Sequence, residues 1–192
     1  RGKKICLTFD DGPVPGVTDY VLSTLARYNV PATFFCVGDN IRKYPEVFRK
    51  VLNDGHQVGN HTFSHLNGWN TETQVYLDNV QRCNELMDMH TAGNGGRAEE
   101  RFFRPPYGRL SKAQSVKLRK SHRIVMWDLL VGDFDRSLHP RKCLQKSLKA
   151  VRPGTIVLFH DSLKSERTMR YVLPRFIEAV KDKGYTFTQL HA

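Results

Sequence analysis

Short apolar runs alternate along the chain with longer segments in which apolar residues recur at helical spacing. The short runs are rich in aromatic or β-branched residues and are bounded by Gly, Pro or polar residues, which predicts strands. The seven predicted strands are KICLTF, ATFFCVG, HQVGN, RFFRPP, RIVMWDL, TIVLFH and YTFTQL. The six predicted helices span residues 17–28, 45–53, 72–90, 111–120, 139–150 and 166–182. Because strands and helices alternate, the sheet should be parallel, with right-handed crossovers.

Two architectures fit this alternation: a small, incomplete (β/α) barrel of about seven parallel strands, or an open doubly wound sheet. A chain of 192 residues is short for a full eight-unit barrel. No linker-like stretch interrupts the pattern, so residues 1–192 are expected to form one domain. In either architecture, functional residues belong at the carboxyl ends of the strands.

Charge adds one candidate class of partner. Thirty Lys and Arg against nineteen Asp and Glu give a formal net charge of +11, so a polyanion must be considered. Residues 97–123 hold nine basic and two acidic residues, but these are spread over a strand, a turn and a helix, which is typical of a solvated face. Without a zinc-finger, basic-zipper or aromatic RNA-binding pattern, no nucleic-acid partner is predicted.

The remaining composition predicts a globular chain without membrane spans. No apolar run reaches the roughly 18 residues that a transmembrane helix needs, and the N-terminal RGKK leads into a strand without a signal-peptide core. The four cysteines, at positions 6, 36, 83 and 143, lack any C-x-x-C spacing. They are expected to be reduced, and those in apolar runs to act as small buried hydrophobes.

The stretch LTFDDGP places two adjacent carboxylates, Asp10 and Asp11, at the end of the first predicted strand. Neighbouring side chains on a strand point to opposite faces, so the two should have different roles unless the turn brings both into one site. A solvated Asp-Asp-Gly turn is the alternative.

The stretch NHTFSHL places His61 and His65 four residues apart, just after the third predicted strand. If a helical turn begins there, both imidazoles share a face and can reach one metal ion. Asp11 is the natural third ligand, because two histidines and a carboxylate leave open positions, as in catalytic zinc and related sites. Two surface histidines are the alternative.

Polar groups also follow two later strands. In RPPYG the two prolines have no N–H, so the backbone N–H of Tyr107 is the first donor free to point into a site, which suits an oxyanion hole. Arg104 could hold a carboxylate such as Asp10 in a bidentate pair. TIVLFHDS brings His160 to the same edge of the sheet. Each segment alone fits a structural role, but together they favour one site.

In their order and separations, TFDDGP, HTFSH, RPPYG and LFHD resemble the first, second, third and fifth motifs of the polysaccharide deacetylase family, the NodB-homology domain of carbohydrate esterase family four. The resemblance covers nearly the whole chain. It implies a distorted (β/α) barrel and a hydrolase that removes N- or O-acetyl groups from sugars with the help of a divalent metal ion. Zinc is the expected ion, with cobalt or another transition metal as the alternative.

The resemblance also implies a role for each candidate residue. Asp10 matches the general base, Arg104 the residue that orients this base, the N–H of Tyr107 an oxyanion donor, and His160 the general acid. Three positions match the metal ligands: Asp11, His61 and His65.

The fourth motif departs from the family pattern. WDLLVGDFD keeps Trp127 and Asp133, but it has Leu130 where the family has its first Asp and Phe134 where the family has its second Trp. Asp133 can still polarise His160, whereas the groove wall and the substrate preference should differ from those of the family.

The implied substrate is an acetylated glycan such as peptidoglycan, chitin-type oligomers or xylan, with N-acetyl favoured over O-acetyl. A substrate of this class favours a location outside the cytoplasm or at the cell envelope. Trp69, Trp127 and Phe134 could stack on sugar faces or serve as packing.

Three other functions compete with this one. A catalytically silent, metal-containing sugar-binding module would keep the barrel, but the presence of both Asp10 and His160 argues against it. A nucleic-acid binder is suggested by charge alone. A sugar isomerase on such a barrel would need no general acid aimed at a leaving group.

Overall fold

The computed structural model describes residues 2–91 and 101–190. The strands are β1 (Lys4–Asp10), β2 (Ala32–Cys36), β3 (Gln57–Asn60), β4 (Arg101–Phe103), β5 (His122–Ile124), β6 (Leu129–Leu130), β7 (Ile156–His160) and β8 (Thr186–Phe187). The α-helices are α1 (Val17–Tyr28), α2 (Gly38–Lys43), α3 (Pro45–Asn53), α4 (Thr73–Thr91), α5 (Lys112–Leu118), α6 (Pro140–Ala150) and α7 (Glu166–Asp182). Two short 3₁₀ turns are η1 (Gly68–Asn70) and η2 (Pro106–Gly108).

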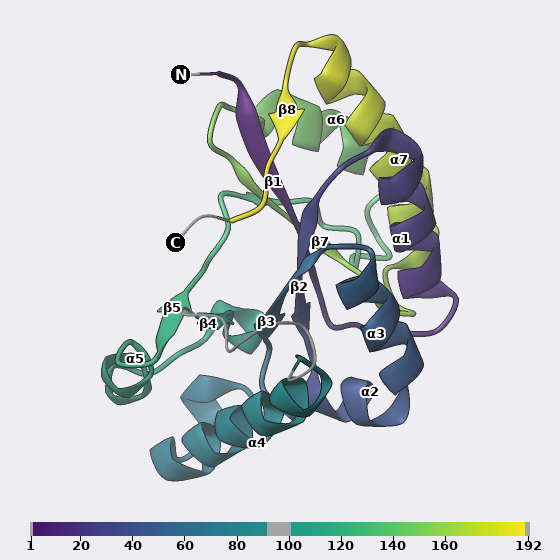
Figure 1. Ribbon diagram of the computed structural model, residues 1–192. Helices are drawn as coiled ribbons and strands as arrows, with labels where there is room; N and C mark the ends of the chain where they lie inside the picture. Colours follow the sequence, from purple (N-terminus) through teal and green to yellow (C-terminus); the bar gives the residue numbers. More distant parts are fainter. Residues whose placement is uncertain (1, 92–100, 191–192) are drawn as a thin grey trace.

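The strands form one parallel sheet in the order β5-β4-β3-β2-β1-β7-β6, with β8 paired to the start of β1 (Figure 1). The two ends of this order, β5 and β6, are the edges of the sheet, which curls into a half-barrel. The expected distorted, incomplete (β/α) barrel of parallel strands is therefore confirmed, and the open doubly wound alternative is wrong.

The helices cover the outside of the curled sheet. α6 packs on α7, α7 on α1, α1 on α3, α2 on both α3 and α4, and α4 on α5. Figure 1 shows α1, α3, α6 and α7 together on one side of the sheet. In the described part of the chain no helix is both long and apolar enough to cross a membrane.

Most predicted elements are confirmed, and two differ. The strand expected over RIVMWDL is two short strands, β5 and β6, because residues 125–128 cross from β4 to β7: the Val125 N–H donates to Phe103 O and the Asp128 N–H to Ile156 O. Helix α2 was not predicted. Only Gly38 and Ile41 are buried in it, which is too few to produce a helical period.

Stacked aromatic rings at the centre of the sheet fix the end of β1. The Phe9 ring lies 5.0 Å from Phe34 on β2 and 5.7 Å from Phe159 on β7, both in stacked geometry, and all three are almost fully buried. Burying each such side chain stabilises the fold by about 1.5–3 kcal/mol. This packing sets the position of the next residue, Asp10.

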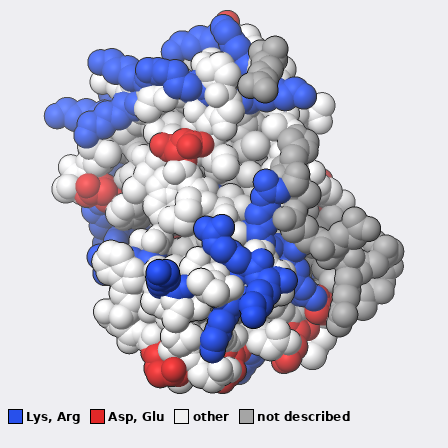
Figure 2. Space-filling model, turned by 90° about the vertical axis from the view of Figure 1, so that its left-hand side faces the viewer, with Lys and Arg blue, Asp and Glu red and all other residues white. Residues whose placement is uncertain are grey.

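Exposed basic side chains surround α5, as expected of a solvated face. They are Lys112, Lys117, Arg119, Lys120 and Arg123, while residues 97–100 of the basic stretch lie outside the described residues. Figure 2 turns the side that carries β5 and α5 toward the viewer, and Lys and Arg cover more of it than Asp and Glu. All four cysteines are free, and three are buried.

A buried polar network links β5 to the end of β3. The Asn84 amide of α4 donates to His122 Nε2 at 3.0 Å, and the Asn60 amide donates to Asn84 Oδ1 at 2.8 Å. Burial, helped by the charge of Arg101, lowers the pKa of His122 to about 4. The folded protein therefore holds this imidazole neutral at pH values where the unfolded chain protonates it.

This network predicts an acid-sensitive contribution to stability. Between the ordinary pKa of 6.5 and about 4, the unfolded chain binds one more proton than the folded one at His122. The free energy of unfolding should fall as the pH falls through this window, by about 1.4 kcal/mol per unit and about 3 kcal/mol in total. Urea unfolding at a series of pH values should show this loss in the wild type and its absence in His122→Gln. Identical pH dependence in the two proteins would contradict the assignment.

Candidate active site

The strand register brings the candidate residues to one edge of the sheet. Asp10 at the end of β1 lies opposite His160 at the end of β7, and Asn60 at the end of β3 lies opposite Phe103 at the end of β4. The His61 N–H continues the ladder by donating to Cys36 O at 3.0 Å. The motifs therefore meet at the carboxyl ends of the strands, as predicted.

Asp10 is buried and held through one of its two oxygens. Arg104 Nη1 donates to Asp10 Oδ1 at 2.8 Å, and both side chains are nearly inaccessible to solvent. Asp10 Oδ2 lies 3.7 Å from His61 Nε2 and accepts no hydrogen bond from the described chain. The predicted Arg104 contact exists, but it uses one oxygen and leaves the other free for chemistry.

The turn after β1 directs the Asp11 carboxylate into the same site as Asp10. Asp11 has a φ of 83°, in the left-handed region, so its side chain does not follow the strand alternation. Asp161, directly after β7, fixes this turn: its Oδ1 accepts from the Gly12 N–H at 3.0 Å and its Oδ2 from the Thr18 hydroxyl at 2.7 Å. A Cβ at Gly12 would collide with the Asp161 carboxylate, so this position requires glycine.

His61 and His65 converge from a loop, so the expected helical turn is wrong. Thr62 and His65 have positive φ values of 62° and 54°, which a regular α-helix does not contain. Asn60 Oδ1 accepts from the Thr62 N–H at 2.7 Å, and Asn79 Oδ1 accepts from two further N–H groups of the loop. Hydrogen bonds to the side-chain oxygens of Asn60 and Asn79 thus take the place of the backbone hydrogen bonds that a helical turn would make.

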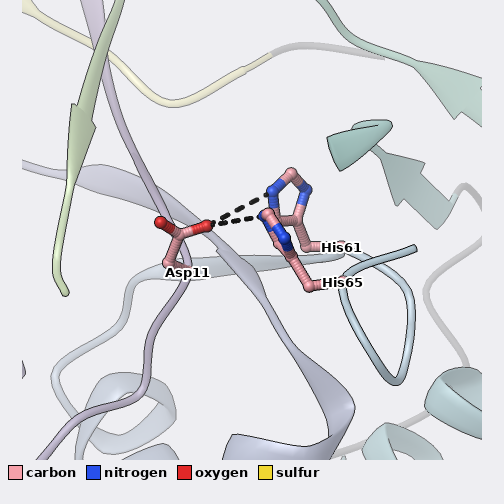
Figure 3. A group of neighbouring side chains, drawn as sticks. All are labelled: Asp11, His61 and His65. Atoms are coloured by element: carbon pink, nitrogen blue, oxygen red, sulfur yellow. Dashed lines mark ion pairs between the residues drawn. The ribbon is translucent and has the colours of Figure 1, made fainter. Parts of the chain in front are cut away.

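Asp11, His61 and His65 form a three-residue cluster with one oxygen at its centre (Figure 3). Asp11 Oδ1 lies 3.1 Å from His65 Nε2 and 3.6 Å from His61 Nε2, and the three donor atoms are within 4.8 Å of one another. Burial would raise the pKa of the Asp11 carboxyl, but hydrogen bonds from the two imidazoles hold it well below its usual range. Asp11 is therefore an anion.

The tautomer of His61 suits a metal. Its Nδ1 lies 2.7 Å from the carbonyl oxygen of Arg104, which can only accept, so Nδ1 carries a proton. In the neutral ring, Nε2 then carries the lone pair and faces Asp11 Oδ1 at 3.6 Å. A catalytic zinc-type site can be built from two imidazoles and a carboxylate. Here the His61 imidazole is also oriented by a backbone carbonyl, as metal-binding histidines commonly are.

Tyr107 bends the backbone around the cluster. Its φ is 59°, its ring lies edge-on against His65 at 4.8 Å, and the residue is 62% exposed. The N–H groups of Gly108 and Arg109 donate to carbonyls of the preceding prolines, whereas the Tyr107 N–H donates to no described residue. It is thus an available donor beside the cluster.

His160 is fixed by a single carboxylate. Asp133 Oδ1 lies 2.8 Å from His160 Nδ1, and Asp133 Oδ2 accepts the His160 backbone N–H at 2.8 Å. Burial opposes the charged imidazole, but the hydrogen bond and charge of Asp133, with smaller contributions from Asp11 and Asp10, raise the pKa of His160 to about 9. The imidazole is therefore protonated near neutral pH, with Nε2 left for a ligand.

These groups line a cavity of about 610 Å³, a size typical of small-ligand sites. The candidates at its surface are Asp10, Asp11, His61, His65, Tyr107 and His160, while Arg104 and Asp133 lie behind them. Its apolar wall includes Trp127, Leu130 and Phe134. Phe134 packs edge-on against the His160 ring at 5.2 Å, so the altered fourth motif contributes wall residues.

Comparison with known proteins agrees with this arrangement. The sequence profile described as "Polysaccharide deacetylase" matches residues 1–126. The chitooligosaccharide deacetylase of Azorhizobium caulinodans is 32% identical over 97% of this chain and 92% of its own length. The chain belongs to the polysaccharide deacetylase family.

Other family members extend the comparison. A peptidoglycan-N-acetylglucosamine deacetylase of Bacillus cereus is 30% identical over 97% of this chain, which spans 66% of that protein. A solved peptidoglycan N-acetylglucosamine deacetylase superposes with a TM-score of 0.89 at 29% identity, covering 99% of this chain and 87% of that one. The same fold also occurs in a protein described as a pseudoenzyme.

Several supporting residues of this candidate site were not predicted. Asp161 fixes the first turn, Asn60 and Asn79 fix the histidine loop, and Thr8 accepts a hydrogen bond from Arg104 Nη1 at 2.8 Å. Asp161 lies within the LFHD motif, so the sequence carried a signal for it. The two asparagines and Thr8 acquire their roles through tertiary contacts.

The pairing of His160 with Asp133 predicts a measurable pKa change in the candidate active site. In the metal-free protein, Asp133→Asn removes the carboxylate that stabilises the imidazolium, so the pKa of His160 should fall below its value of about 9. NMR titration of the His160 ring proton checks this, and metal content after reloading should equal that of the wild type. An unchanged pKa, or loss of metal binding, would show that Asp133 has another role.

Proposed function

We propose that this chain is a divalent-metal-dependent hydrolase that removes acetyl groups, N-acetyl in preference to O-acetyl, from sugar residues of a polysaccharide. The observation that carries the proposal is the pairing of two differently held groups in one cavity. Asp10 is a buried carboxylate with one free oxygen, and His160 is an imidazole kept protonated by Asp133. A base and an acid in one cavity are what amide hydrolysis requires.

The metal would be held by Asp11, His61 and His65, whose donor atoms already converge. A divalent ion there supplies Lewis-acid chemistry: it polarises an acetyl carbonyl and lowers the pKa of a water from about 15.7 to about 7. Zinc suits two imidazoles and a carboxylate with open positions, and cobalt or another transition metal accepts the same donors.

The protein's own groups perform the proton transfers. Asp10 would accept a proton from the attacking water at Oδ2, because Oδ1 is occupied by Arg104. His160 would donate a proton to the leaving nitrogen or oxygen from Nε2, because Nδ1 is bound to Asp133. Such proton transfers contribute about 10² to 10⁴ each to the rate.

The Tyr107 N–H would stabilise the developing negative charge. It has no partner among the described residues, and the positive φ of Tyr107 turns the peptide beside the histidine cluster. A preorganised donor of this kind contributes more as the acetyl oxygen becomes an anion than it does in the ground state.

The named relatives support a glycan substrate, because they are deacetylases of chitooligosaccharide or of peptidoglycan N-acetylglucosamine. A peptidoglycan substrate would place the working protein at the cell envelope. The competing function is a catalytically silent sugar-binding module, and the presence of Asp10, His160 and the three candidate ligands favours the enzyme.

Metal removal tests the proposal directly. Acetate release from chitin oligomers, peptidoglycan and acetylated xylan should be abolished by exhaustive chelation and restored by zinc or cobalt, because the proposed water is no longer acidified without the ion. Undiminished acetate release from metal-free protein would contradict the proposed mechanism. Glycan binding without acetate release at full metal occupancy would establish the silent module instead.

Two variants test the division of labour between the adjacent aspartates. Asp11→Asn replaces an anionic ligand with a neutral amide, so metal occupancy and turnover should fall together. Asp10→Asn keeps all three proposed ligands, so metal should stay bound while turnover drops by about 10² to 10⁴. Metal analysis of the folded variants separates the roles, with Asp182→Asn at the exposed C-terminal end of α7 as a matched folding control. Equal metal loss in both aspartate variants would show that they act as a joint ligand pair.

A further inference from the structure

Two basic side chains in the cavity have no assigned role. Arg109 lies two residues after Tyr107, in the segment between β4 and α5. Lys164 lies two residues after Ser162, in the loop between β7 and α7. Both are exposed, and both line the cavity that contains the proposed acid and base. Neither contributes to the proton transfers or to the metal cluster.

Neither cation forms a close ion pair with a carboxylate of the described chain, although Lys164 interacts electrostatically at longer range with Asp135, which lines neither cavity. No carboxylate lies within ion-pair distance of Arg109 or Lys164 among the residues that the structure describes. The acidic groups of the cavity are occupied: Asp10 pairs with Arg104, and Asp11 contacts the two imidazoles. The cavity therefore presents positive charge to a ligand, and a divalent ion would increase it.

Each cation lies over an aromatic ring that positions it. The Arg109 guanidinium is 4.9 Å from the ring of Trp69, which is 65% exposed, and the Lys164 ammonium is 5.4 Å from the ring of Phe134. Such cation–π contacts hold each cation over the face of its ring. They leave the N–H groups free to donate to an anion. Phe134 is also one of the two residues that depart from the family's fourth motif.

The cavity continues past Lys164 into a second one. A neighbouring hollow of about 550 Å³ shares Asp11, His65, Ser162 and Lys164 with the first. Its one other acidic residue, Asp39, is already paired with Arg42 and Lys43. Lys164 thus stands where the two cavities meet, and Arg109 lines only the first. A ligand extending through both cavities would meet both cations.

We infer that Arg109 and Lys164 select an acetylated glycan that carries carboxylate groups, and that they bind these carboxylates beside the acetylated sugar. The inference rests on the proposed function and adds the charge class of its substrate. A guanidinium can hold a carboxylate through two parallel N–H···O bonds, and an ammonium acts as a point charge. A neutral chitin-type oligomer offers neither group a partner.

Three tetrasaccharides of equal length test the inference on the metal-loaded protein. One alternates N-acetylglucosamine with N-acetylmuramic acid and has free lactyl carboxylates, the second is the same glycan with its carboxylates converted to amides, and the third is tetra-N-acetylchitotetraose. The wild type should show a kcat/KM for the free acid about tenfold above that for the amide, and added salt should reduce this preference.

Variants assign the preference to the two residues. Arg109→Gln with Lys164→Gln should raise KM for the free acid about tenfold, with a smaller effect on kcat, so that acid and amide become equal. Arg109→Lys, which keeps the charge, should retain part of the preference. Lys142→Gln on α6 removes one exposed charge away from both cavities and should leave the preference as in the wild type.

The outcomes separate this inference from the proposed function. Equal rates for acid and amide in the wild type, or a preference that survives in the double variant, would overturn the inference. Deacetylation of chitotetraose in the same experiment would still support the proposed deacetylase function. No acetate from any of the three glycans would overturn both. A preference lost equally in Lys142→Gln would assign it to net charge and overturn the role of the two residues.

Discussion

The buried guanidinium of Arg104 is the group on which most of the site's geometry depends. Its Nε donates to Val125 O, its Nη2 to Met126 O, and its Nη1 to both Thr8 Oγ1 and Asp10 Oδ1. A charge buried this completely costs several kcal/mol unless it is paired and fully hydrogen-bonded. The strand ends that supply these oxygens must therefore stay in place for the charge to be tolerated.

The main chain of Arg104 extends this constraint to the metal cluster. Its N–H donates to Asn60 O at 3.0 Å, and its carbonyl accepts from His61 Nδ1 at 2.7 Å. One residue thus orients the proposed base through its side chain and a proposed metal ligand through its backbone. The spacing between the proposed base and the cluster is consequently held by two hydrogen bonds that share one buried residue.

The parts of the site that could be predicted are those that strand order determines. Asp10 and His160 end neighbouring strands, so parallel pairing alone brings them together. His61 and His65 were correctly grouped, but the reason given was wrong: helical spacing suggested the contact, whereas a loop held by Asn60 and Asn79 makes it. Amide contacts of this kind depend on α4 packing beside the loop, which no local pattern encodes.

The collision between Gly12 and Asp161 has a consequence for how this sequence can change over time. The two positions are 149 residues apart, yet any side chain at Gly12 would occupy the space of the Asp161 carboxylate. Replacing Asp161 first leaves the turn N–H and the Thr18 hydroxyl without their acceptor, and replacing Gly12 first creates an overlap. Each order of single steps therefore has a cost, one through a lost hydrogen-bond acceptor and the other through a steric overlap, so the first and fifth motifs constrain each other.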